Sequence, residues 1–403
     1  MLLLGASGAV ATAAAATQHG PQHTSPRPDH DVAPATEGPG DYAEKQLATN
    51  GEGGFPAYRI TALTVTTSGT VLASYDGRPT DSDAPGPNSI LQRRSTDNGA
   101  TWGPQEAIAA GKTSAPIEGY SDPSYIVDRE TGTIFNFHMK SYDAGFGGSQ
   151  RGVDPEDRNV LQAHLSTSTD DGRTWTHRTI TADVTADPSW RSRFASSGQG
   201  IQLRYGPHAG RLLQQYAIIN GAGTIQAVSV YSDDHGKTWQ AGEPVGTDMN
   251  ENKTVELSDG RVMLNSRDSG DSGFRKVAYS TDGGVTYGRV TIDRELPDPR
   301  NNASVVRAHP NAPRDSKKAK VLLFSNAASS TSRSNGTVRM SYDDGRTWPV
   351  SRVFQRAGMA YSTLATLPDG KIGLLYEPNA GNGGIRFATF DLDWLLHGGA
   401  GSG

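Results

Sequence analysis

The chain contains no cysteine among its 403 residues. The absence of cysteine excludes disulfide bridges, thiolate chemistry and cysteine-based zinc sites. It does not exclude secretion, because a large secreted domain can fold without disulfides. Basic residues number 38 against 43 acidic ones, and the densest basic cluster, residues 317–320, is interrupted by Ala319. Because nucleic-acid binding needs a basic surface, we expect no nucleic-acid partner.

Long apolar runs are also rare, and the one apolar stretch lies at the start of the chain. Residues 1–17 are rich in leucine and alanine and resemble the apolar core and cleavage zone of a signal peptide, although a basic leading segment is missing. The alternative is an apolar tail without structure. No later segment is apolar enough to span a bilayer, so we expect a secreted protein without a membrane span.

Composition divides the remaining chain into three parts. Residues 18–40 hold five prolines and predict an extended linker that cannot bury a core. Residues 41–396 form the expected folded domain, and residues 397–403 a flexible tail. The chain has 48 glycines and 23 prolines, and no long amphipathic helical pattern accompanies them, which favours an all-β fold of short strands and tight turns.

One octamer, Ser-x-Asp-x-Gly-x-Thr-Trp, occurs five times, with tyrosine in place of tryptophan in the fourth copy. The aspartate is expected to accept hydrogen bonds from the backbone of its own turn, and the glycine to supply a positive φ. The threonine and the aromatic residue then return into a strand, with the ring packed under the turn. The copies span residues 95–102, 168–175, 232–239, 280–287 and 341–348.

The spacing of these copies predicts the architecture. Their starts are about 61 residues apart on average, enough for one four-stranded sheet with its loops, and residues 41–396 hold about six such units. We therefore predict a six-bladed β-propeller in which one blade lacks the motif, with the hairpins on the solvent rim. Further predicted strands are residues 70–75, 89–94, 227–231, 319–324 and 371–376.

The repeated octamers resemble the Asp-boxes, or bacterial neuraminidase repeats, of sialidases and of some propellers without enzymatic activity. A second set of segments is similar to the small secreted bacterial exo-sialidases over residues 57–394. Tyr58-Arg-Ile-Thr61 resembles a Tyr-Arg-Ile-Pro signature, with threonine in place of proline. The other matching segments are residues 74–79, 83–87, 121–124, 251–254, 264–268, 332–334 and 359–361.

This resemblance implies a role for each of eight residues. The arginines Arg59, Arg267 and Arg333 would grip the carboxylate of sialic acid, and Arg78 and Asp122 would contact the sugar ring. The catalytic residues implied are the acid/base Asp83, the nucleophile Tyr361 and its partner Glu251.

The implied set is chemically reasonable. Sialic acid carries a carboxylate on its anomeric carbon, and planar guanidinium groups suit a carboxylate best. A carboxylate nucleophile would be repelled by that charge, whereas a neutral tyrosine would not, provided that a base such as Glu251 takes its proton. The expected course is a retaining double displacement, with Asp83 on a mobile loop as the acid.

Each of these residues also has an ordinary structural interpretation. A single arginine is usually a solvated surface charge, and Arg333 lies in a polar Ser/Thr-rich loop. Asp83 fits simple turn chemistry. Tyr361 fits a half-buried strand residue, and Glu251 a solvated carboxylate in a polar loop. Their joint occurrence, in order, favours the catalytic interpretation.

We therefore predict an exo-α-sialidase that removes terminal sialic acids from glycans, glycoproteins or glycolipids. We expect it to act as a monomer without a cofactor. We also expect no metal, because the ten histidines do not have the spacing of metal ligands. Two alternatives stay open. In the first, the same catalytic residues serve transfer of sialic acid or the hydrolysis of related nonulosonic acids. In the second, the propeller binds glycans without catalysis.

Overall fold

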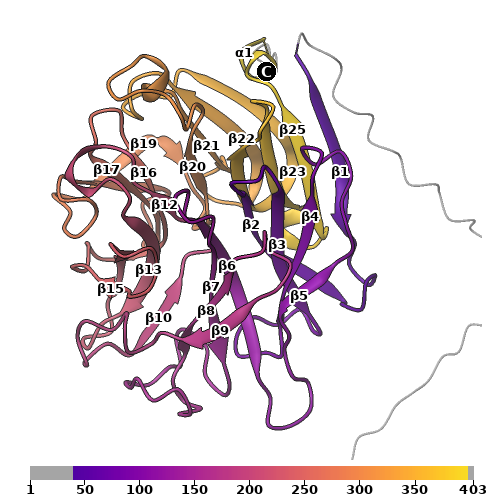
Figure 1. Ribbon diagram of the computed structural model, residues 1–403, viewed down its shortest axis with the longest axis vertical. Helices are drawn as coiled ribbons and strands as arrows, with labels where there is room; N and C mark the ends of the chain where they lie inside the picture. The colour runs from indigo at the N-terminus through magenta and orange to yellow at the C-terminus, as the bar shows by residue number, and fades with distance from the viewer. Residues whose placement is uncertain (1–39, 398–403) are drawn as a thin grey trace, which may run out of the picture. The chain divides into compact units, whose positions relative to one another are not determined.

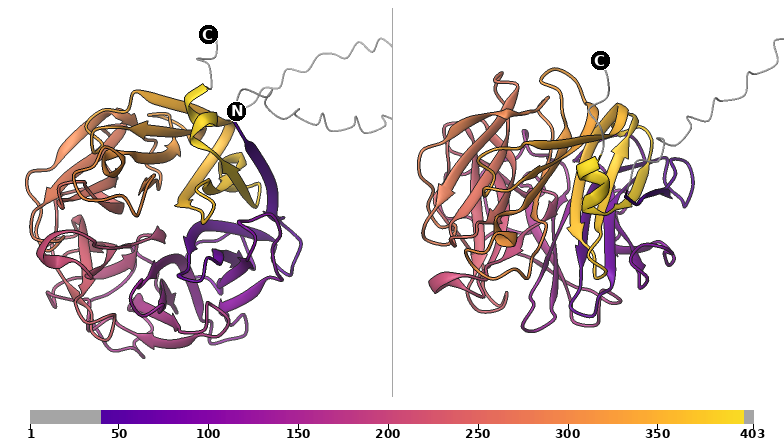
Figure 2. Two further views of the ribbon diagram at one scale, coloured as in Figure 1. Left: turned by 45° about the horizontal axis from the view of Figure 1, so that its top comes forward. Right: turned by 90° about the horizontal axis from the view of Figure 1, so that it is seen from above.

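The computed structural model describes residues 40–397, which lie in one compact unit, Gly38–Gly403. The signal-peptide-like segment 1–17, the linker as far as residue 39 and the tail from residue 398 lie outside the described residues. Within them no helix is both long enough and apolar enough to cross a membrane. Figures 1 and 2 show antiparallel sheets that follow one another around a central axis, in the manner of a propeller.

Four of the sheets are short meanders in which consecutive strands pair. Two short strands extend two of these sheets: β11 (Gly198–Gln199) pairs in parallel with β6 (Gly119–Val127), and β12 (Ile201–Gln202) pairs with β13 (Leu212–Ile219). The first two sheets contain β2 (Ala57–Val65), β3 (Val71–Arg78), β4 (Ser89–Ser95) and β5 (Glu106–Ala109), then β6 (Gly119–Val127), β7 (Ile134–Ser141), β8 (Gln162–Ser168) and β9 (Thr176–Thr179). The next two contain β10 (Ser192–Ala195), β13 (Leu212–Ile219), β14 (Ile225–Ser232) and β15 (Gln240–Ala241), then β16 (Met249–Glu256), β17 (Val262–Asp268), β18 (Phe274–Ser280) and β19 (Thr291–Pro297).

The fifth sheet has seven strands in the order β1-β25-β24-β23-β22-β21-β20. The described residues thus form five continuous sheets, not the six separate ones that the sequence predicted, because the 17-residue β23 pairs with β22 through its first half and with β24 through its second. Its strands are β1 (Tyr42–Ala48), β20 (Ser304–Arg307), β21 (Leu322–Ala327), β22 (Ser334–Ser341), β23 (Val350–Thr366), β24 (Ile372–Pro378) and β25 (Ile385–Phe390).

Short helical elements complete the chain. They are the 3₁₀ turns η1 (Gly206–His208), η2 (Lys318–Lys320) and η3 (Asn379–Gly381), and the helix α1 (Leu392–His397). One sequence-based boundary was wrong: the strand expected at residues 319–324 begins only at Leu322, since η2 precedes it. The last residue of α1, His397, lies one position beyond the predicted domain 41–396.

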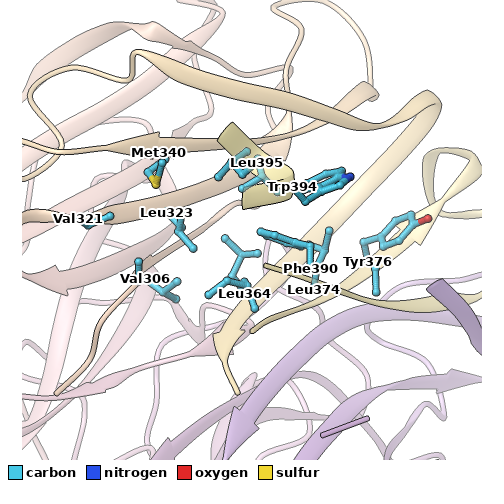
Figure 3. Packing of buried hydrophobic residues seen from close by; sticks show 14 of the residues in the cluster. Val306, Val321, Leu323, Met340, Leu364, Leu374, Tyr376, Phe390, Trp394 and Leu395 are labelled. Carbon is cyan, nitrogen blue, oxygen red and sulfur yellow. The ribbon is translucent and has the colours of Figure 1, made fainter. Parts of the chain in front are cut away.

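The core lies between neighbouring sheets and, in the seven-stranded sheet, between its two halves. In the largest apolar cluster, Val306 and Leu323 of β20 and β21 approach Leu374 and Phe390 of β24 and β25, and Trp394 of α1 closes one side (Figure 3). Most inner strands are buried on both faces, which explains why their sequences lack a clean alternation of apolar and polar residues.

Each repeated octamer forms the same set of hydrogen bonds. In the first copy Asp97 accepts the backbone N–H of Thr101 at 2.8 Å and its hydroxyl at 2.6 Å, and Ser95 Oγ accepts the N–H of Gly99 at 2.8 Å. The bond from the Thr101 hydroxyl contributes most to lowering the pKa of Asp97 to about 2. The equivalent aspartates of the other copies are Asp170, Asp234, Asp282 and Asp343.

These hairpins also contact the preceding sheet, so they are more than turns on a solvent rim. Gly236 has a φ of +80°, and a Cβ placed on it would lie 2.2 Å from the ring of Phe135 in β7. Trp239 of the same copy packs edge-on against Phe135 and Phe137. The glycine is therefore required both by its backbone angle and by the close approach of two sheets.

Candidate active site

Four inner strands carry a register irregularity at or beside a residue singled out from the sequence. The pairing of β2 shifts between Arg59 and Thr61, and that of β6 between Ser121 and Ser124, on either side of Asp122. The pairing of β16 shifts between Met249 and Asn252, and that of β23 between Met359 and Ser362. Bulges redirect side chains out of the regular pleat, so these four strands can present polar groups to one point near the axis.

Tyr361 and Glu251 meet across the axis although 110 residues separate them. The Tyr361 hydroxyl donates a hydrogen bond of 2.8 Å to Glu251 Oε2. Arg267 Nη1 donates to the same oxygen at 2.6 Å and lies 3.2 Å from the Tyr361 oxygen. Glu251 is 3% exposed and lies on β16, so it is not the solvated loop carboxylate of the ordinary structural interpretation.

The surroundings of Tyr361 set its protonation. Burial and the charge of Glu251 raise the pKa of its hydroxyl well above the ordinary value, while Arg267 and Arg333 act in the opposite direction. The Arg333 guanidinium lies 5.3 Å from the centre of the Tyr361 ring. Its loop is tied to β23 because the Arg333 carbonyl accepts the N–H of Met359 at 2.9 Å. The resting tyrosine is therefore a neutral hydroxyl beside a carboxylate.

Arg59 is held by a carboxylate that sequence reasoning missed. Arg59 Nε donates to Glu377 Oε2 at 2.7 Å, and the backbone N–H of Ile60 donates to Glu377 Oε1 at 2.6 Å. The charge of Glu377 raises the pKa of Arg59. Ile60 has a φ of +61°, which is costly for a β-branched residue. Glu377 thus stabilises both the guanidinium and the strained bulge that presents it.

Asp76 is the second missed residue. Its carboxylate accepts Arg78 Nη2 at 2.9 Å and the backbone N–H of Asp122 at 3.1 Å. Arg78 also reaches Asp83 Oδ1 at 3.2 Å, in the loop between β3 and β4. Asp83 is 75% exposed at its side chain, whereas Asp76 is fully buried. Burial raises the pKa of Asp76 to about 7.

The eight residues predicted from the sequence lie close enough together to affect one another's pKa. The pKa of Asp122 is raised well above its ordinary value, first by burial and then by the charges of Asp76, Asp83 and Glu251. The charge of Asp83 likewise raises the pKa of Arg59, after the larger effect of Glu377, and Tyr361 lies close enough to interact with the same guanidinium. One sequence signal points to Glu377: a carboxylate that ends an apolar strand, Leu374-Leu-Tyr-Glu377. Asp76 similarly follows Val71-Leu-Ala-Ser-Tyr75.

The arrangement can receive an anion. Arg267 Nε is buried and has no hydrogen-bond partner among residues 40–397, so the described residues do not satisfy every donor of this guanidinium. In the same range no group of three or more histidines and carboxylates is arranged to hold a metal ion. The site therefore combines guanidinium groups for an anionic ligand with a hydroxyl–carboxylate pair and an exposed carboxylate for proton transfer.

Comparison with known proteins gives consistent relatives. Residues 69–374 match the family model of the BNR repeat-like domain. The chain is 72% identical over 354 residues to a sialidase of Micromonospora viridifaciens, covering 88% of this chain and 54% of the relative. It is 30% identical over 381 residues to an exo-alpha-sialidase of Aspergillus fumigatus, with 86% of each chain covered.

Solved structures agree. A Hadza microbial sialidase superposes with a TM-score of 0.78 at 31% identity, covering 86% of this chain and 68% of the other. An intramolecular trans-sialidase of Ruminococcus gnavus has a TM-score of 0.75 at 21% identity, which shows a shared fold. The chain spans 54% of the Micromonospora relative and 61% of a Bacteroides fragilis sialidase to which it is 31% identical.

Proposed function

The chain belongs to the sialidases, a family of BNR-repeat glycoside hydrolases, and we propose that it is an exo-α-sialidase that hydrolyses terminal α-linked sialic acids. One observation carries the proposal most directly: the hydrogen bond of 2.8 Å between the Tyr361 hydroxyl and Glu251, flanked by Arg267 and Arg333. A protein that only binds glycans has no use for such a pair.

The arginines would bind the substrate carboxylate. Arg59, Arg267 and Arg333 come from distant parts of the chain, and Arg267 and Arg333 both lie against Tyr361. A close guanidinium–carboxylate pair at a protein-like dielectric is worth on the order of 4 kcal/mol before desolvation costs. Glu377 would hold Arg59 in place, and Asp76 would do the same for Arg78 and the backbone of Asp122.

In the first step the Tyr361 oxygen would attack the anomeric carbon. Its proton would move to Glu251, and the bond to the leaving sugar oxygen would break as that oxygen takes a proton from Asp83. A neutral nucleophile avoids repulsion with the substrate carboxylate, which agrees with the raised pKa of Tyr361. Arg267 contacts both partners and would stabilise the charge that passes between them.

In the second step water would replace the tyrosyl oxygen. Asp83 would take a proton from the water, Glu251 would return its proton to Tyr361, and the sugar would leave with its α configuration retained. Asp83 lies on an exposed loop and is restrained by Arg78 at 3.2 Å. A bound substrate would cover this loop and exclude solvent from Asp83.

We also propose a count of six blades, with the seven-stranded sheet regarded as two. Val350–Gly358 of β23 pairs with β22 and Met359–Thr366 with β24. Apolar residues of the two halves then pack face to face (Figure 3). In this proposal residues 41–396 are one catalytic domain of a secreted monomer, acting on sialylated glycans, glycoproteins or glycolipids.

The proposal is tested with a fluorogenic α-sialoside and two chains, native and Tyr361→Phe. The native chain should release the fluorophore, and the variant should lose at least about 100-fold in kcat, because phenylalanine cannot form the covalent bond. No release by the native chain would reject the enzyme, and equal release by both would reject Tyr361 as nucleophile.

NMR of the first product separates hydrolysis from transfer. Free sialic acid should appear first as the α anomer. An initial β anomer would contradict retention. An anhydro-sugar, or a sialylated acceptor when lactose is added, would instead indicate transfer on the same machinery.

A further inference from the structure

A cavity opens at the end of the axis opposite to the candidate active site. The inner strands begin beside that site, at Arg59 and Glu251, and end at the cavity, which Val65 of β2 and Glu256 of β16 help to line. Its volume is about 1010 Å³. This is at the upper end of the range for small-molecule sites, and apolar residues of several sheets contribute to its walls.

The cavity lining is cationic. Three arginines, Arg129, Arg204 and Arg307, line it together with Lys318, and Glu256 is the one carboxylate in the lining. Glu256 is already engaged, because its oxygens accept the backbone N–H groups of Arg204 and Tyr205, each at 2.9 Å. Within the lining, the positive charges therefore outnumber the one carboxylate, although Asp128 and Glu130 also lie near Arg129.

Arg307 is the least satisfied of these cations. It is 8% exposed, yet neither its Nε nor its Nη1 has a hydrogen-bond partner among the described residues. The nearest carboxylate, that of Glu256, is 3.9 Å from Nη1, while Nη2 donates to the Tyr205 hydroxyl. Leaving buried donors of a charged group unpaired is costly, and because Arg307 lines the cavity, an anion bound there would reduce that cost through its charge.

The other two arginines are also poorly compensated. Arg129 Nη2 donates to the carbonyl of Gln202 at 3.0 Å, and Arg204 Nη2 donates to the side-chain oxygen of Asn311 at 2.7 Å. Both acceptors are neutral. Burial and the neighbouring Arg204 charge lower the pKa of Arg129 to about 10, against the opposing effect of Glu256, Asp128 and Glu130, so a bound negative charge would reduce the remaining penalty.

We propose that this cavity is a second ligand site, which binds a small organic anion through a carboxylate or phosphate group held by Arg307 and Arg204. The partly exposed Val65, Val127 and Ile201 offer apolar contact to the body of the ligand, and the volume admits one or two sugar-sized rings. The site does not depend on the proposed catalysis, because the two share no residue.

Calorimetric titration with citrate and with inorganic phosphate tests this site. The variants are Arg307→Gln in the cavity and Arg333→Gln in the candidate active site, which serves as the matched control. We expect native protein to bind at least one of the anions. Arg307→Gln should weaken that binding at least about tenfold, the loss of one charge-assisted contact, and Arg333→Gln should retain it. Citrate binding alone would identify a carboxylate site, and phosphate binding alone a phosphate site.

Two results would overturn the proposal. In the first, native protein binds neither anion at about 20 mM, a concentration far above the Kd of a specific site. In the second, Arg307→Gln binds both anions as tightly as native protein does. Thermal unfolding reports whether Arg307→Gln is folded. If it is not, Arg204→Gln decides in its place, since Arg204 is only half-buried. Unchanged binding in that variant would equally reject the site.

Discussion

Lys253 is a buried cation close to the proposed catalytic groups. It lies on β16 two residues after Glu251, is 3% exposed, and donates from Nζ to the side-chain oxygen of Asn302 at 3.0 Å. Burial lowers its pKa from 10.5 to about 7, although the charges of Glu251 and Asp122 act against the shift. The protonation of this one residue therefore links the stability of the fold to pH.

We expect Lys253→Met to flatten the pH dependence of stability. In the native state Lys253 releases its proton near pH 7, whereas in the unfolded chain it keeps the proton up to its ordinary pKa of 10.5. Unfolding between these values takes up a proton, so this group makes the free energy of unfolding rise with pH by at most about 1.4 kcal/mol per unit. Urea unfolding from about pH 7 to pH 9.5 measures the slope within that window.

The control for this measurement is Lys237→Met, which removes an exposed lysine at the tip of the third hairpin. It should leave the slope as in the native protein. A Lys253→Met slope equal to the native one would show that the lysine does not titrate in this window.

Single residues also show what sequence alone could reach. The side chains of Tyr361 and Glu251 are in contact although the residues lie 110 positions apart in the sequence, and no local sequence pattern predicts this contact. They were predicted only because the chain resembles a family. Asp76 and Glu377 were missed because their sequence surroundings predict ordinary buried strands. Each carboxylate holds a bulged residue of another strand by accepting its backbone N–H, Asp122 for Asp76 and Ile60 for Glu377, and the sequence does not indicate this pairing.

At the scale of elements, the repeated hairpin is both a turn and a joint between sheets. We expect Gly236→Ala to reduce the free energy of unfolding by at least about 2 kcal/mol, since the new methyl group would be strained at φ +80° and would also collide with Phe135. Gly223→Ala is the matched control: its φ is +88°, but nothing lies within 4 Å of the added carbon. It should cost only about 1 kcal/mol.

Urea unfolding of both variants separates the two costs. Equal losses in the two variants would mean that the hairpin glycine serves the turn alone and that the contact with β7 contributes nothing.

The hairpins were predictable because every hydrogen bond that defines them joins residues no more than four positions apart, as from Thr101 to Asp97. Sheet boundaries were less accessible. No sequence signal marks the point where β23 changes partner from β22 to β24, so five continuous sheets appear where six were expected. The late start of β21 has a similar cause, because η2 forms within a segment of strand-like composition.

At the scale of the whole described unit, the chain closes its ring with its first strand. β1 pairs with β25, and Figure 1 shows the two side by side. Glu44 accepts Arg386 Nη1 at 2.9 Å and the Tyr376 hydroxyl at 2.5 Å, and Tyr42 stacks on Trp394. This closure covers the otherwise open edge of β25.

We expect a chain that begins at residue 49 to unfold at least about 10 °C below one that begins at residue 40, because it loses the β1 pairing and the burial of Leu47. Differential scanning calorimetry of the two chains measures the difference. Equal midpoints would show that β1 is not needed to close the ring.

The most direct test of the proposed mechanism is to trap the covalent intermediate. A sialic acid with fluorine at C2 and C3 offers a good leaving group, while the fluorine at C3 slows the second step. Mass spectrometry of the inactivated native chain should find one sialosyl group, on the peptide that contains Tyr361. A sugar attached to Asp83 or Glu251, or turnover with no trapped adduct, would contradict the account.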